Sequence, residues 1–239
     1  MSLAENITPH ESDGEPLREY TSMVSTPGGR SVTVEVFEPP DNMVHPAVIV
    51  LHGADGPTRK ADEYREICRL LANNGFVALR AHYFDAGPPP APGYEHLGNP
   101  LAHAAWLQAV TSTADYAASL PAVLDSPVGL LGFSLGSYLA LAAAAIQQRY
   151  AAIVEFFGGM PEMVMGFVDI MPPTLIIHGG ADPIVPVAEA YKLQRLFEQK
   201  KFLHEIHIYP GEAHNFTPFS RANAYNRALY FMKLHLQRP

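Results

Sequence analysis

The sequence predicts a single α/β domain, built on a mostly parallel sheet of about eight strands with helices on both faces and no large cap domain. Three observations support this prediction. From residue 47 onward, short apolar runs alternate with helical stretches, which is typical of crossover units on a parallel sheet. The chain has 239 residues, within the range of one large α/β domain. Hydrophobic residues make up 48% of it and charged residues 17%, which excludes a disordered chain.

The N-terminal part of the domain is predicted to be an antiparallel hairpin. Residues 1–18 are polar and are expected to form a flexible segment, so the domain spans residues 19–239. Tyr20–Val24 and Val32–Phe37 have the alternating pattern of half-buried strands, and a Pro-Gly-Gly turn separates them. A short turn of this kind joins neighbouring antiparallel strands.

Six further apolar runs predict the strands of the parallel part of the sheet. Their lengths and lack of alternation fit strands that are buried on both faces. They are Ala47–Leu51, Phe76–Leu79, Val128–Leu131, Ala152–Phe157, Thr174–Ile177 and Ile206–Tyr209.

Amphipathic helices are predicted between these runs. Tyr64, Ile67, Cys68 and Leu71 follow helical spacing, so they share one face and are expected in the core. The same spacing recurs in two later stretches, residues 106–117 and 225–236. The prolines of Asp85–Pro100 are too dense for a helix or a central strand, so this segment is predicted to be a surface loop.

Composition and charge exclude several kinds of partner and location. The chain has 16 Lys and Arg against 24 Asp and Glu, and a net charge of −8 has the wrong sign for binding nucleic acid. Its single cysteine cannot form an intramolecular disulfide. The first residues lack the basic and apolar regions of a signal peptide, so a cytoplasmic location is expected. Residues 126–148 carry no charge, but glycines and serines interrupt them, so no membrane span is expected.

A Gly-Phe-Ser-Leu-Gly motif, residues 132–136, lies between a predicted strand and a predicted helix. In this context a GxSxG motif forms a tight turn that projects the serine hydroxyl above the sheet, and the small glycines avoid a clash there. The helix that follows directs its N-terminal amides toward the serine, where they stabilise negative charge. The motif therefore predicts that Ser134 is a catalytic nucleophile.

A serine nucleophile needs a base, and the base needs an orienting acid. Asp182 follows the predicted strand Thr174–Ile177, and His214 follows the next predicted strand. The order serine, aspartate, histidine, each after a successive strand, is that of the α/β-hydrolase fold, which we expect for this chain. Asp169 is a weaker candidate for the acid, because it lies in an irregular stretch before a strand.

Backbone amides are predicted to form the oxyanion hole. The amide of Leu135 follows the nucleophile, and the glycine-rich loop after Ala47–Leu51 offers a second donor, which we assign to Ala54. Four aromatic residues on loops at the same sheet edge are expected to line the substrate pocket: Tyr83, Phe84, Tyr94 and Phe216.

Neither a metal nor a cofactor is expected. His204 and His207 are three residues apart in a predicted strand and point to opposite faces, so they cannot share an ion. His52 and His178 end strands near the site and are expected to pack against its loops or to hydrogen-bond them. The chain also lacks the glycine-rich phosphate-binding motifs of nucleotide-binding proteins.

From about Val32 to its C-terminus, the sequence resembles the dienelactone hydrolase family of α/β hydrolases. The resemblance implies a cytosolic hydrolase that acts on esters or similar acyl compounds, with Ser134, Asp182 and His214 as its catalytic residues. The segments that carry it are Leu51-His52-Gly53, Gly132-Phe133-Ser134-Leu135-Gly136, His178-Gly179-Gly180-Ala181-Asp182 and Gly211-Glu212-Ala213-His214-Asn215-Phe216.

The sequence departs from this family at positions that concern the substrate. Members that open dienelactones typically have a cysteine nucleophile and a glutamate beside the oxyanion loop, where this chain has Ser134 and Gly53. Those members hold the substrate carboxylate with two arginines, at positions where this chain has Ala86 and Pro218. Carboxylic esters or lactones are therefore the expected substrates, and these departures leave open whether dienelactone is one of them.

Other functions remain open from the sequence. The same triad could hydrolyse thioesters or amides, or catalyse cofactor-free perhydrolysis, and a catalytically silent relative would only bind a ligand. The expected partner is a small-molecule acyl substrate, and the expected assembly is a monomer or a homodimer.

Overall fold

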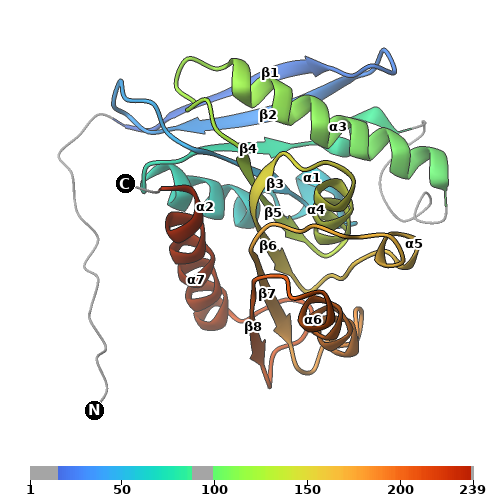
Figure 1. The fold of residues 1–239 in the computed structure, drawn as a ribbon. Helices are drawn as coiled ribbons and strands as arrows, with labels where there is room; N and C mark the ends of the chain where they lie inside the picture. Colours follow the sequence, from blue (N-terminus) through green and yellow to red (C-terminus); the bar gives the residue numbers. More distant parts are fainter. Residues whose placement is uncertain (1–15, 88–98, 238–239) are drawn as a thin grey trace.

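The computed structural model describes residues 16–87 and 99–237, which form one α/β-hydrolase domain around an eight-stranded sheet (Figure 1). The strands lie in the order β1-β2-β4-β3-β5-β6-β7-β8. Their bounds are β1 Arg18–Ser25, β2 Ser31–Glu38, β3 Ala47–Leu51, β4 Val77–Ala81, β5 Val128–Phe133, β6 Tyr150–Phe156, β7 Thr174–Gly179 and β8 His204–Tyr209.

The sheet is mostly parallel, as predicted. β1 and β2 form the expected antiparallel hairpin, and β2 also pairs antiparallel with β4. The other six strands run parallel to one another. The strands turn progressively across the sheet, from β1 at one edge to β8 at the other, which is the twist that L-residues impose (Figure 1).

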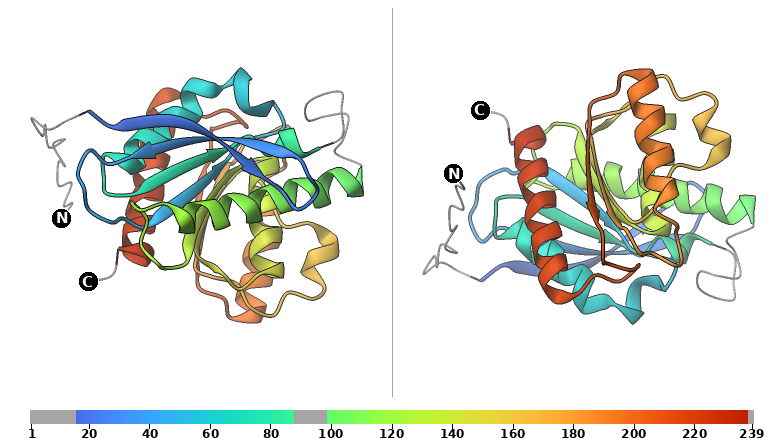
Figure 2. Two further views of the ribbon diagram at one scale, coloured as in Figure 1. Left: turned by 90° about the horizontal axis from the view of Figure 1, so that it is seen from above. Right: turned by 90° about the horizontal axis from the view of Figure 1, so that it is seen from below.

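Helices cover both faces of the sheet. The amphipathic face of α2 and the buried residues of α7 pack on one face, and α3, α4 and α6 pack on the other (Figures 1 and 2). The helices of the described chain are α1 Gly56–Arg59, α2 Ala61–Ala72, η1 Tyr83–Ala86 (a 3-10 turn), α3 Pro100–Ser119, α4 Leu135–Ile146, α5 Glu162–Met165, α6 Ala188–Lys200 and α7 Pro218–Leu236.

The hydrophobic periodicity identified the inward helix faces correctly. Tyr64, Ile67, Cys68 and Leu71 of α2 are all buried against β3 and β4. The buried cysteine has a raised pKa because burial disfavours its thiolate. It is therefore a core residue, as the sequence predicted.

Two boundaries differ from the prediction. Arg18 already belongs to β1, where it pairs with Glu38, so the strand begins one residue inside the segment expected to be flexible. Pro100, expected to end a loop, is instead the first residue of α3, and the Asn99 side chain caps that helix. Proline is favoured at a helix start because its missing N–H would have no partner there. The remainder of the predicted loop, residues 88–98, lies outside the described residues.

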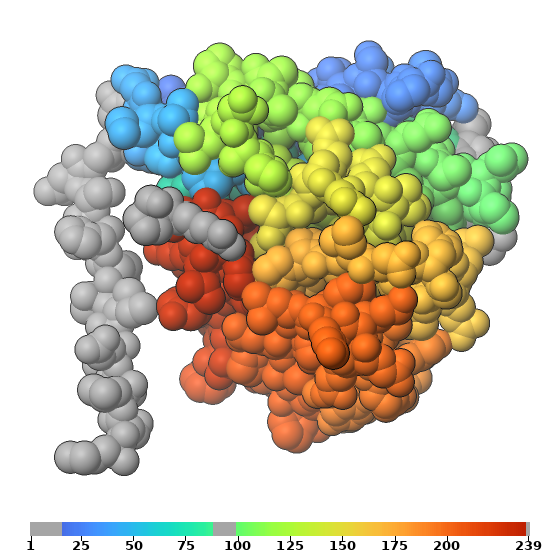
Figure 3. All heavy atoms as spheres, viewed as in Figure 1, coloured from blue at the N-terminus to red at the C-terminus, as the bar shows by residue number. Residues whose placement is uncertain are grey.

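This architecture places three loops at the carboxyl edge of the sheet, after β5, β7 and β8. In the space-filling view the described segments form one continuous body, from β1 at the top to α6 and β8 at the bottom (Figure 3). Within residues 16–87 and 99–237, no helix combines the length and the apolarity needed to cross a bilayer.

Candidate active site

Ser134 occupies the sharp turn between β5 and α4. Its backbone has φ 52° and ψ −115°, a conformation that side-chain-bearing residues rarely adopt. The turn is possible because two glycines let main chains approach closely. A Cβ on Gly132 would lie 2.4 Å from the Gly136 carbonyl oxygen, and a Cβ on Gly136 would lie 2.3 Å from that of Leu51. Any larger residue at either position would therefore displace the nucleophile turn.

The structure brings Ser134, His214 and Asp182 into one chain of hydrogen bonds. Ser134 Oγ lies 3.1 Å from His214 Nε2, and His214 Nδ1 lies 2.7 Å from Asp182 Oδ2. Because a carboxylate can only accept, Nδ1 carries the proton and Nε2 of the neutral imidazole accepts from the serine hydroxyl. The three side chains thus have the geometry of a nucleophile, a general base and an orienting acid.

The Asp182 carboxylate is buried, and backbone amides of its loop hold it in place. Its Oδ1 accepts the backbone amides of Ile184 at 2.8 Å and of Val185 at 3.0 Å. His178 Nε2 donates to the Val185 carbonyl at 2.9 Å and so supports the same loop, as predicted for this histidine. Burial lowers the His178 pKa, which favours the neutral form of its ring.

Asp169, the other candidate acid, lies elsewhere. Its exposed carboxylate pairs with Lys200 at 3.1 Å, on the side where α6 ends. It makes no hydrogen bond with His214, which is paired with Asp182.

Two backbone amides beside Ser134 are available to an oxyanion. Leu135, the first residue of α4, and Ala54 both line the cavity that contains Ser134. Their N–H groups have no hydrogen-bond acceptor within the described chain. Ala54 lies on a loop that Tyr64 fixes, because the Tyr64 hydroxyl accepts the Gly53 amide at 2.9 Å and donates to Asp55 Oδ1 at 2.8 Å.

Tyr83 and Phe84 do not line the cavity, contrary to the prediction. The short turn η1 directs them toward the loop after β3, where Tyr83 stacks on His52 with 4.1 Å between ring centroids. The Tyr83 hydroxyl donates to the His52 carbonyl at 2.8 Å, and Phe84 meets the His52 ring edge-on. Burial lowers the His52 pKa to about 3, so this ring is a neutral support. Tyr94 lies outside the described residues.

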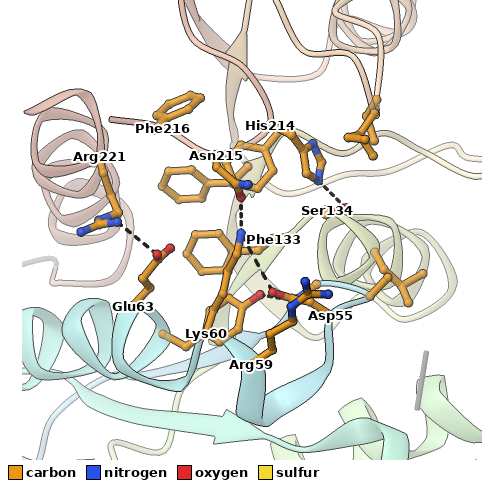
Figure 4. Close-up of a pocket in the computed structure, with 18 of the residues that line it drawn as sticks. Asp55, Arg59, Lys60, Glu63, Phe133, Ser134, His214, Asn215, Phe216 and Arg221 are labelled. Atoms are coloured by element: carbon orange, nitrogen blue, oxygen red, sulfur yellow. Dashed lines mark hydrogen bonds and ion pairs between the residues drawn. The ribbon is translucent and has the colours of Figure 1, made fainter. Parts of the chain in front are cut away.

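Phe216 does line the cavity, which has a volume of about 530 Å³ and opens next to Ser134. The walls combine an aromatic surface with charged side chains contributed by residues 55–63, which include α1 and the start of α2, and by α7 (Figure 4). The aromatic residues are Tyr64, Phe133, Tyr138, Phe156, Phe157, Phe216 and Tyr225; the charged residues are Asp55, Arg59, Lys60, Glu63 and Arg221.

Lys60 extends across this cavity. Its ammonium donates to Asn215 Oδ1, next to the predicted base, and lies 4.0 Å from Asp55 Oδ2. Figure 4 shows the Lys60 side chain between the Ser134–His214 pair and the Arg221–Glu63 ion pair.

Sequence reasoning did not identify the charged wall. Lys60 and Asn215 are 155 residues apart, and no local pattern connects them. Tyr64 was assigned to the core from its helical spacing, yet the end of its ring reaches the cavity. The one local signal for this part of the cavity is that Asn215 directly follows His214 in the sequence.

For a metal, the described residues offer no group of three His, Cys, Asp or Glu side chains close enough to share an ion. His204 Nδ1 instead hydrogen-bonds the Phe202 carbonyl, and His207 contacts Arg227.

A family model of the dienelactone hydrolase family matches residues 33–234 of the chain. This span runs from within β2 to within α7 and includes the three loops that meet at Ser134. The chain belongs to the dienelactone hydrolase family. It is therefore an α/β hydrolase.

Individual relatives agree with this family assignment. A Synechocystis protein provisionally named a carboxymethylenebutenolidase is 25% identical over 199 residues, which cover 75% of this chain and 78% of that protein. A provisionally assigned dienelactone hydrolase from Klebsiella pneumoniae has TM-score 0.79 at 18% identity, covering 92% of this chain and all of that one. The dienelactone hydrolase-like promiscuous phosphotriesterase P91, from metagenomic libraries, has TM-score 0.75 at 20% identity, covering 91% of this chain and 99% of that one. At these identities the two structures show a shared fold.

Proposed function

We propose that this dienelactone hydrolase family member is a serine hydrolase that cleaves carboxylic esters or lactones through an acyl-enzyme intermediate. The observation that carries the proposal is the continuous hydrogen-bonded chain from Ser134 Oγ through His214 to Asp182, with distances of 3.1 Å and 2.7 Å. A base within hydrogen-bonding distance of the hydroxyl is the requirement for activating serine.

In the first half of the proposed reaction, Ser134 Oγ attacks the substrate carbonyl carbon while His214 Nε2 takes the hydroxyl proton. The amides of Leu135 and Ala54 donate to the oxyanion, and the N-terminus of α4 adds its dipole. The carbon–oxygen bond to the leaving group then breaks, and His214 returns the proton to the departing alkoxide. Asp182 stabilises the imidazolium that exists between these two steps.

In the second half, a water molecule attacks the acyl carbon of the Ser134 ester, with His214 again taking the proton. The bond from the acyl carbon to Ser134 Oγ breaks, and the proton passes from His214 to the serine oxygen. The carboxylic acid leaves and the enzyme is restored. In a lactone the alcohol and the acid belong to one product molecule.

The cavity supports a small acyl substrate with an apolar part. A volume of about 530 Å³ suits a small molecule, and its aromatic walls can bury a hydrocarbon or aryl group. The name of the Synechocystis relative, a carboxymethylenebutenolidase, supports lactones as one substrate class. The positions of the family's two carboxylate-binding arginines are occupied by Ala86, which is buried, and by Pro218, which begins α7.

The test is hydrolysis of a series of p-nitrophenyl esters and simple lactones by the purified protein and by S134A. We expect S134A to reduce kcat by about three orders of magnitude or more, because the nucleophile is lost. S119A, an exposed serine at the end of α3, is the matched control and should keep full activity. Undiminished turnover by S134A would contradict the proposal.

The same experiment separates the alternative functions. Thioesters, amides and perhydrolysis of esters can be tested as further arms of the acyl series. A catalytically silent relative would fail to react with a fluorophosphonate probe, whereas an activated Ser134 should be labelled rapidly and S134A should not.

A further inference from the structure

Glu155 is a buried carboxyl group to which the proposed reaction gives no role. It lies on β6, between Gly132 of β5 and Ile176 of β7, and none of its surface is exposed. Its Oε2 accepts the Gly158 amide at 2.9 Å, while its Oε1 has no partner among the described residues. Burying a polar group with an unsatisfied oxygen costs stability, so its presence requires an explanation.

The Glu155–Gly158 hydrogen bond closes a turn in which the backbone is strained. Phe157 has φ 43°, in the left-handed region that side chains disfavour, and its amide donates to the Ile177 carbonyl at 2.7 Å. Such a conformation persists only where surrounding contacts enforce it. Two hydrogen bonds hold this turn. The Phe157 amide donates to the Ile177 carbonyl on β7, and the Gly158 amide donates to the Glu155 carboxyl.

This turn lies directly behind the nucleophile. The Ser134 amide donates to the Phe156 carbonyl at 2.8 Å, and the Ser137 hydroxyl accepts the Phe156 amide at 3.0 Å. A Cβ on Gly158 would lie 2.9 Å from the Ser134 carbonyl oxygen. A shift of the turn would therefore move the backbone of Ser134.

The same turn also contacts the base. The Phe157 ring packs against the His214 imidazole with 4.8 Å between centroids, and against Phe216 at 5.5 Å. The left-handed backbone of Phe157 sets the direction of this ring. One buried carboxyl thus fixes a turn that contacts both Ser134 and His214.

We propose that Glu155 is a positioning residue for the Ser134–His214 pair, acting through the turn from Glu155 to Gly158. The inference rests on the proposed function of that pair. Glu155 does not touch the reacting atoms, so its effect is on their alignment. Small displacements of reacting groups reduce the rate of the chemical step more than they reduce substrate binding.

The charge state of Glu155 gives this role a pH dependence. Burial raises the pKa of its carboxyl to about 8, and the groups that lower it, the Gly158 amide and the Ser137 hydroxyl, are neutral. Its titratable neighbour is Tyr138 of α4, whose own pKa burial raises to about 12. Glu155 is therefore neutral at pH 7. Its ionisation would place an unpaired charge behind Ser134, where it opposes the negative charge of the oxyanion.

The test compares wild type with E155Q and E155A. Glutamine keeps the oxygen that accepts the Gly158 amide and cannot ionise, whereas alanine removes the acceptor. We expect E155A to lower kcat about tenfold or more with KM changed less than about threefold, and E155Q to restore most of kcat. In wild type kcat should decline above about pH 8, and in E155Q this decline should be absent.

A second measurement does not depend on activity. The His214 imidazole resonances in NMR spectra, assigned with H214Q, should shift in E155A and stay near their wild-type positions in E155Q. A folded E155A with wild-type kcat and unshifted His214 resonances would overturn the proposal. If E155A does not fold, E155Q decides: an alkaline decline identical to that of wild type would overturn it. Failure of the serine hydrolase proposal is distinguishable, because wild type itself would then show neither turnover nor fluorophosphonate labelling.

Discussion

At the scale of single residues, the site depends on hydrogen bonds that fix which atom carries a proton. Asp182 is held by two backbone amides, so its Oδ2 faces His214 Nδ1 and keeps the proton on that nitrogen. His214 Nε2 is then free to accept from Ser134.

The first prediction concerns the acid. D182N should lower kcat by about four orders of magnitude, because the asparagine amide can donate to Nδ1 and stabilise the wrong tautomer of His214. D169N, which alters the exposed partner of Lys200, is the matched control and should leave kcat unchanged. Steady-state kinetics on a p-nitrophenyl ester checks both variants. Similar losses in the two would argue that Asp182 is not the acid.

The second prediction concerns the oxyanion loop. Y64F removes the hydroxyl that pairs with the Gly53 amide and Asp55, which leaves buried polar groups unsatisfied. We expect the free energy of unfolding to fall by about 1–3 kcal/mol. We also expect kcat to fall about tenfold, with KM nearly unchanged. Y116F removes a hydrogen bond to Ser22 on β1, away from the site, so its kcat should match wild type. Denaturant titration and kinetics together measure these effects.

At the scale of elements, a buried ion pair anchors the loop that carries the charged cavity wall. Arg80 of β4 is 1% exposed, pairs with Glu35 of β2 and donates to the Pro57 carbonyl in α1 at 2.6 Å. Burial would raise the Glu35 pKa, but the hydrogen bonds from His82, Arg65 and Arg80 hold it well below its usual range. This network connects the antiparallel edge of the sheet to the helix preceding Lys60.

The third prediction follows from this network. R80M should reduce the free energy of unfolding by about 3–5 kcal/mol, because the buried Glu35 carboxylate loses the positive charge of Arg80 that stabilises it. R69M breaks an exposed ion pair with Glu19 and should reduce the free energy of unfolding by less than about 1 kcal/mol. Urea denaturation near pH 7 compares the two. Equal effects would show that the buried pair contributes no more than the exposed one.

At the scale of the whole molecule, buried titratable groups shape the pH dependence of stability. His52 has a folded pKa of about 3 against an ordinary 6.5, so acidification below 6.5 protonates the unfolded chain first and favours unfolding. Glu155 has a folded pKa of about 8 against an ordinary 4.5. Its contribution to the free energy of unfolding is therefore fully present below pH 4.5 and is lost as the pH rises to 8. The two effects oppose each other between 4.5 and 6.5.

The fourth prediction uses the range above pH 6.5, in which Glu155 contributes without the opposing effect of His52. Between pH 6.5 and 8 the wild-type free energy of unfolding should fall by up to about 1.4 kcal/mol per pH unit from this one group. E155Q lacks the group, so the difference in stability between E155Q and wild type should rise across this range in favour of the variant. Denaturant titrations at several pH values measure that difference directly. A difference that stays constant with pH would mean that Glu155 is not buried as a neutral acid.

The strands and helices could be read from the sequence where hydrophobic patterns were uninterrupted. β4 was predicted to end at Leu79 because Arg80 breaks the apolar run, although the structure buries this arginine in the sheet by pairing it with Glu35. Charge alone cannot indicate burial, because the compensating partner lies 45 residues away. Tyr83 and Phe84 were assigned to the cavity for a similar reason: strand order identifies the sheet edge of a loop but not the direction of its side chains.

The sequence by itself determined the α/β layering, the nucleophile turn and the order in which Ser134, Asp182 and His214 follow their strands. These features are local, since hydrophobic period, close glycine packing and strand-to-loop order are each written in consecutive residues. Only the tertiary structure decided the hydrogen bonds among the three residues, the Lys60–Asn215 contact across the cavity, and the contacts of the Glu155–Gly158 turn with Ser134 and His214. Those contacts join segments that only the folded sheet brings together, so no pattern along the chain specifies them.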